Sequence, residues 1–142
     1  MIIISPYAKK LQNGKENPKN YPYWDELIAL IDEPIIQVGV DGENPLVEDF
    51  RPNLSMPQLR QLIKDCRVWI GVDSFFQHLA WSEGKPGIVL WSVSDPLIFG
   101  HPENHNLLKS RDNLAKNQFL WWDFIEYDKE KFISPQEVIK FL

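Results

Sequence analysis

The feature that most constrains this fold is an apolar stretch that runs directly into a helical pattern, residues 68–80. Val68–Val72 (VWIGV) is short, apolar and rich in β-branched residues, as expected of a strand buried on both faces. Phe76, Leu79 and Ala80 then follow with the spacing of an apolar helix face. The stretch therefore predicts a buried strand followed at once by a helix, the unit from which parallel α/β sheets are built.

Polar residues lie at the predicted junction between this strand and this helix. Ser74 with Gln77 three residues later fits a capping box, and Asp73 is predicted either to cap the helix or to orient a ligand. The first backbone amides of the helix, those of Phe75 and Phe76, suit an anion such as phosphate. Because open α/β sheets bind ligands at the carboxyl ends of their strands, we take this junction as the candidate site.

Strand and helix patterns alternate along the rest of the chain. Strands are expected at 2–4, 34–38, 46–50 and 87–91, with weaker ones at 107–108 and 119–122. Helices are expected to begin near Tyr23, after Ser55 and after Ser134, and residues 92–106 are expected to form a loop or a single helical turn. This alternation over 142 residues predicts one three-layer α/β domain with a mostly parallel sheet, residues 1–142.

The charge of the chain limits its partners. It has 15 basic and 20 acidic residues, a net charge of −5, which argues against a nucleic acid. Four lysines nevertheless gather in the long loop predicted at 7–22, where they suit a small anionic ligand: Lys9, Lys10, Lys15 and Lys19. His78, His101 and His105 show no metal-ligand spacing, so no metal site is expected.

The expected location is cytoplasmic. Cys66 is the only cysteine, so no internal disulfide is expected, and its apolar neighbours predict a buried structural thiol. No apolar run approaches the ~20 residues needed to span a bilayer. Met1–Ile4 has no basic region and is interrupted by Ser5-Pro6, which indicates a first strand and not a signal peptide.

Several short motifs follow one another in a defined order along the chain. Residues 73–80 (DSFFQHLA), Gly84-Lys85-Pro86 and residues 90–96 (LWSVSDP) follow one another, and Lys19-Asn20-Tyr21-Pro22 precedes the helical pattern at 24–28. Together they resemble the donor half of family 9 glycosyltransferases, the heptosyltransferases of lipopolysaccharide assembly, which use ADP-heptose. The final pattern from Ile133 resembles the closing helix of that family.

The resemblance implies a Rossmann-like domain, equivalent to the C-terminal half of a two-domain, B-type glycosyltransferase. Its ligand would be a nucleotide-diphosphate sugar, with an ADP-sugar favoured, and no further cofactor is implied. In the family, the acceptor half supplies the catalytic base, so no catalytic residue is assigned here. The isolated chain is expected to bind without catalysing, unless a partner chain or a second copy supplies that half.

Roles can be predicted for single residues. With the resemblance, Lys19 is the candidate cation for the diphosphate, with Lys15 as the substitute. Glu43, or Asp41, is placed to bond a ribose hydroxyl, although an ordinary turn acid is the alternative. His78 is a candidate for contact with phosphate or sugar, and a packed structural histidine is equally compatible with its position.

Two positions depart from the family pattern. Phe75 replaces a glycine at which the backbone approaches the diphosphate, and Ser92 replaces the glycine after the strand that ends in Trp91. Two alternative functions therefore stay open. The first is a non-catalytic module that senses or sequesters a nucleotide or a sugar nucleotide. The second is a degenerate domain retained for protein contacts through its aromatic C-terminal region.

Overall fold

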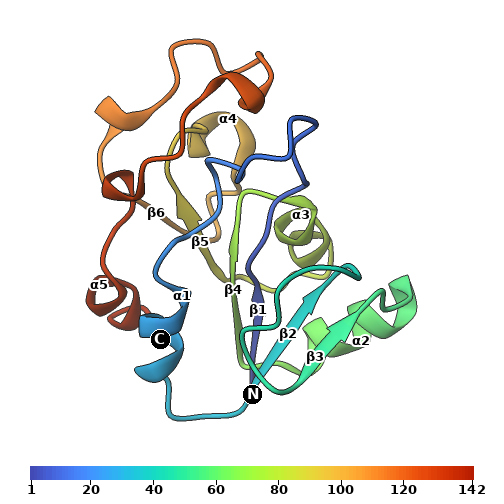
Figure 1. Cartoon of the computed structure of the whole chain (residues 1–142). Helices are drawn as coiled ribbons and strands as arrows, with labels where there is room; N and C mark the ends of the chain where they lie inside the picture. Colours follow the sequence, from blue (N-terminus) through green and yellow to red (C-terminus); the bar gives the residue numbers. More distant parts are fainter.

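The computed structural model describes all residues, 1–142, and contains one six-stranded parallel sheet (Figure 1). The strand order is β3-β2-β1-β4-β5-β6, which is the Rossmann order. The strands are β1 (Ile2–Ser5), β2 (Ile35–Gly39), β3 (Phe50–Pro52), β4 (Val68–Val72), β5 (Ile88–Trp91) and β6 (His105–Leu108). The helices are α1 (Trp24–Ala29), α2 (Met56–Asp65), α3 (Phe75–Ser82), α4 (Pro96–Phe99) and α5 (Pro135–Ile139).

Helices cover both faces of the sheet, so the predicted three-layer α/β fold is confirmed. Alternate residues of β1 point into different cores: Ile2 and Ile4 into one, Ile3 into the other. The first core also contains Leu27 from α1 and Val138 from α5. The second is closed by these residues of α2 and α3: Leu62, Ile63, Phe76, Leu79 and Ala80. All strand pairs are parallel, where the sequence predicted a mostly parallel sheet.

Several local predictions are confirmed. The strand at 68–72 and the helix that follows it have the predicted positions. Ser55 caps α2 in a complete capping box with Gln58, and Ser134 caps α5 by accepting from the amide of Glu137. Cys66 is buried, and burial raises the pKa of its thiol. No helix is both long enough and apolar enough to cross a bilayer.

Two predicted strands are wrong. The strand expected at 46–50 begins only at Phe50, because the side chain of Gln37 holds the preceding loop. Its Nε2 donates to the carbonyl of Asn44 and its Oε1 accepts from the amide of Leu46. The strand expected at 119–122 does not form either, since β6 has no further neighbour in the sheet. The chain there forms turns and a short 3₁₀ helix, Trp122–Phe124.

The loop at 7–22 is long but well anchored. Asn20 accepts from the amide of Ala8, and Asn17 donates to the carbonyl of Lys9. Ser92, at the carboxyl end of β5, donates its hydroxyl to the carbonyl of Pro18. Ser92, which departs from the family pattern, therefore anchors the loop to the sheet. Its partner, Pro18, directly precedes Lys19 in the sequence.

Candidate functional site

The candidate site lies at the carboxyl end of β4, where α3 begins. β4 pairs with β1, and the chain connections on the two sides of this pair run in opposite directions. This is the switch point at which Rossmann-like sheets bind ligands. The backbone amides of Phe75 and Phe76 have no acceptor within the protein. Phe75 is 59% exposed, so its ring is not packed into the core beneath these amides, and it lines a cavity at the start of the helix.

The carboxylate of Asp73 contacts two other side chains at the site, those of Gln77 and Lys19. Its Oδ1 accepts from Nε2 of Gln77 at 2.8 Å, and its Oδ2 lies 3.5 Å from Nζ of Lys19. The ion pair is largely buried and joins residues 54 positions apart. Lys19 also lies over the ring of Trp122, 5.4 Å from its centroid. The position of the Lys19 ammonium is therefore set by Asp73 and by an aromatic face.

The predicted capping roles of Asp73 and Ser74 are wrong. Ser74 is the N-cap residue of α3, but its side chain accepts no hydrogen bond from the helix. Gln77 does not complete the capping box, because its amide is drawn to the carboxylate of Asp73. Ser74 Oγ and Gln77 Oε1 are buried without a hydrogen-bond partner. Buried polar atoms without a partner are uncommon in folded proteins.

Two adjacent cavities meet at Ser74. The first has a volume of about 430 Å³, and its lining includes Lys19, Asp73, Ser74 and His78. The second has a volume of about 570 Å³ and is mainly apolar, and its lining includes Ser74, Phe75, Phe76 and Glu43. The seven predicted ligand-binding residues thus line two cavities that flank the start of α3.

Glu43 has a defined place in the second cavity. Its Oε1 accepts from the amide of Val40 at 2.8 Å, so the side chain folds back over the strand end. Gly39 makes this possible, because a Cβ at that position would overlap the carboxylate. Burial raises the pKa of Glu43, and the hydrogen bond from Val40 acts in the opposite direction. Asp41 does not line this cavity.

His78 is one of a pair of histidines. Its Nδ1 lies 2.8 Å from Nε2 of His101, and the indole of Trp81 stacks on His101 with centroids 4.6 Å apart. Burial, followed by the neighbouring His101, lowers the pKa of His78. With Nδ1 occupied, Nε2 of His78 is the nitrogen left for a ligand. His105 lies elsewhere, against Phe141.

Sequence reasoning did not find the other five residues that line the first cavity: Phe99, Gln118, Phe119, Leu120 and Trp122. Gln118 lines it and donates Nε2 to the carbonyls of Val93 and Ala115, which holds the segment before Phe119 in place. Trp122 also lines it. No local pattern marks either residue, since both reach the cavity from an irregular segment far from β4 in sequence.

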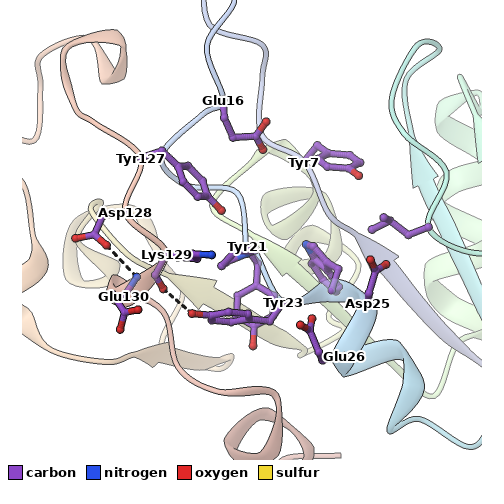
Figure 2. Close-up of a pocket in the computed structure, with 13 residues that line it drawn as sticks. Tyr7, Glu16, Tyr21, Tyr23, Asp25, Glu26, Tyr127, Asp128, Lys129 and Glu130 are labelled. Atoms are coloured by element: carbon purple, nitrogen blue, oxygen red, sulfur yellow. Dashed lines mark hydrogen bonds between the residues drawn. The ribbon is translucent and has the colours of Figure 1, made fainter.

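A further cavity, of about 810 Å³, is lined by four tyrosines and several acids, and it shares only Tyr7 with the second cavity of the candidate site (Figure 2). Its tyrosine hydroxyls already donate to backbone carbonyls: those of Tyr7, Tyr21, Tyr23 and Tyr127. Burial is the main cause that raises the pKa of Tyr7, Tyr21 and Tyr127, so these phenols stay protonated. None of the seven predicted ligand-binding residues lines this cavity.

Comparison with known proteins identifies the family of the chain. The model of glycosyltransferase family 9 (heptosyltransferase) matches residues 40–119, more than half of the chain. The chain belongs to glycosyltransferase family 9. The matched segment contains β4, α3 and most of the lining of the two cavities. The resemblance seen in the sequence motifs is thereby confirmed.

A curated relative supports the same assignment. The chain is similar to lipopolysaccharide heptosyltransferase 3 of Escherichia coli, with 26% identity over 121 residues. The alignment covers 76% of this family 9 chain but 35% of the relative, so the chain spans about a third of that protein's length. No solved structure matches the chain significantly.

Proposed function

We propose that this family 9 domain binds a nucleotide-diphosphate sugar across the start of α3. The observation that carries the proposal is the pair of cavities that meet at Ser74: one is mainly apolar, and the other, which we call the polar cavity, has a mixed lining that includes Lys19 and Asp73. A diphosphate on the free amides of Phe75 and Phe76 would place the base on one side and the sugar on the other. The family membership supports a sugar-nucleotide ligand.

Lys19 is the proposed partner of the diphosphate. It lines the first cavity together with Ser74, and its ammonium lies beside Asp73 and over the ring of Trp122. A ligand phosphate would share this ammonium with the carboxylate, and the charge-assisted contact would be strong because the pair is shielded from water. The buried hydroxyl of Ser74 would gain a partner in the same phosphate.

The apolar cavity is the proposed place of the base and ribose. Its walls include Val38, Leu54, Met56 and Leu59, which suit a flat heterocycle. Glu43 lies in the same cavity at the end of β2, where a carboxylate accepts hydrogen bonds from ribose hydroxyls in related folds. We propose an ADP-sugar as the first ligand to test.

We propose that the chain binds without transferring the sugar by itself. The one carboxylate at the polar cavity, Asp73, is engaged by Lys19 and Gln77 and is not free to act as a general base. Transfer would then require a partner chain or a second copy that supplies an acceptor site. The same observation favours the second candidate function, a cytoplasmic module that senses or sequesters a sugar nucleotide.

Titration calorimetry with ADP, ADP-sugars, UDP and GDP tests the proposal. We expect ADP or an ADP-sugar to bind more tightly than UDP or GDP, and the Glu43→Gln variant to lose affinity while it still folds. Absence of binding to all four at millimolar concentration would contradict the proposal. A matched control is Glu48→Gln, which removes one carboxylate outside both cavities.

A further inference from the structure

An exposed apolar surface lies beyond the carboxyl edge of the sheet. Three segments form it: the tip of the loop at 8–16, helix α4, and residues 116–124, which gather at the top of Figure 1. Its protruding side chains are Leu97 (81% exposed), Ile98 (47%), Phe119 (79%), Leu120 (55%), Trp121 (64%) and Phe124 (80%). We call these three segments together the apical surface. Such a concentration of exposed apolar side chains marks an interaction site.

Direct contacts hold the three segments together. The amide of Asn13 donates to Oδ2 of Asp123, and Nδ2 of Asn13 donates to the carbonyl of Asp123. The ring of Phe99 in α4 lies edge-on to those of Phe119 and Trp122, with centroids 6.1 and 6.4 Å away. The apical surface is therefore a single assembled feature rather than three separate loops.

The charge of the apical surface is opposite to that of the whole chain. It contains four exposed lysines, none of which forms an ion pair: Lys9, Lys10, Lys15 and Lys116. Its acids are Asp123, which accepts from Asn13, and Glu16, which accepts from Asn20 and lines the tyrosine cavity (Figure 2). Four lysines minus two acids leave a charge of +2, against −5 for the chain.

We propose that the apical surface docks on an anionic lipid bilayer. Trp and Phe side chains favour the level of the lipid headgroups, and each nearby lysine strengthens attachment to anionic lipid. Six apolar side chains that protrude from two of these segments suit a soft medium, whereas a protein partner would need a matching pocket for each. The acidic lining of the tyrosine cavity would be repelled by the same membrane and would help to orient the domain. The proposal requires no particular ligand at α3, but the apical surface borders both cavities there: Phe119 and Leu120 line the first, and Lys9 and Lys10 line the second.

Co-sedimentation with vesicles tests the proposal. The wild-type chain is expected to bind phosphatidylcholine vesicles that contain phosphatidylglycerol, to bind pure phosphatidylcholine weakly, and to be released by salt. The triple variant Lys9→Gln, Lys10→Gln, Lys15→Gln should bind about 100-fold more weakly, from about fivefold per lysine. Phe119→Ser with Trp121→Ser should weaken binding at least about tenfold.

Matched controls separate docking from general effects of charge and surface polarity. Lys129→Gln, Lys131→Gln, Lys140→Gln removes the same charge outside the apical surface, and Phe141→Ser removes an exposed ring there; both should bind nearly as the wild type does. Absence of binding to anionic vesicles, or equal losses in apical and control variants, would overturn the proposal. So would a dimer in analytical ultracentrifugation that Trp121→Ser abolishes, since the surface would then bind a second copy.

Discussion

Nδ1 of His78 lies 2.8 Å from Nε2 of His101, so the two imidazoles share one hydrogen bond at the edge of the polar cavity. One nitrogen of this contact must carry the proton and the other must accept it, which excludes two fully protonated rings. The indole of Trp81 stacks on the imidazole of His101 and helps to hold that ring in its orientation. The pair therefore sets which nitrogen of His78 faces a ligand.

We predict that this pair makes stability depend on pH. Burial and the neighbouring His101 lower the pKa of His78, so the unfolded chain binds its proton at a higher pH than the native chain does. The free energy of unfolding should therefore fall as the pH decreases from about 6.5 to below the native pKa of His78. Urea unfolding at a series of pH values measures this, and His78→Phe should remove that part of the dependence.

The control for the histidine prediction is His105→Phe, which removes a histidine that lies against Phe141 and outside the pair. Asp95, whose pKa is lowered mainly by its hydrogen bonds from Arg111, also loses stabilising interactions in acid, but at lower pH. Curves for wild type and His78→Phe that run parallel between neutral pH and about 5 would show the prediction to be wrong.

A second prediction concerns Lys19. Lys19→Met should lower the affinity for ADP or an ADP-sugar by about 10-fold to 100-fold, the range of one charge-assisted hydrogen bond. Calorimetry measures the loss, and thermal unfolding checks that the variant folds despite the carboxylate of Asp73 left without its cation. Lys15→Met is the matched control, because Lys15 lies outside both cavities at α3. Equal affinities of the two variants would remove Lys19 from the proposed site.

A third prediction compares two serines that occupy the same position in the same local motif. Ser55→Ala should lower the free energy of unfolding by about 1 kcal/mol, because it removes a complete capping box. Ser74→Ala should change it by less than about 0.5 kcal/mol, because the Ser74 side chain caps nothing and its hydroxyl is buried without a partner. Chemical denaturation measures both, and a larger loss at Ser74 would contradict the geometry of α3.

A fourth prediction tests the packing at the amino ends of β4 and β5. Gly87→Ala should destabilise the chain by about 1–3 kcal/mol, because its new Cβ would overlap the indole of Trp69. That indole is fully buried and donates to the carbonyl of Lys85, so it has no room to move. Gly84→Ala is the comparison: its Cβ meets nothing within 4 Å, and only the positive φ of 70° opposes it, at about 1 kcal/mol. Losses in the reverse order would refute this account.

The sequence alone determined the elements that depend on nearby residues. The apolar run Val68–Val72 predicted β4 with its observed bounds, and the Ser55 and Ser134 motifs predicted where α2 and α5 begin. These signals are local, because burial on both faces and a cap each require only a few adjacent residues. The motifs also identified the family and directed attention to the start of α3.

Only the tertiary structure decided which partners the polar side chains of the site take. Ser74 and Gln77 carry the same motif as Ser55 and Gln58, yet Gln77 turns to Asp73, which Lys19 approaches from 54 positions away in sequence. The segment at 119–122 has the composition of a strand, but no strand edge accepts it, and its rings enter the apical surface instead. A side chain forms hydrogen bonds with the groups that the folded chain places near it, and a strand pairs only where a sheet edge is near. Adjacent residues in the sequence do not determine either partner.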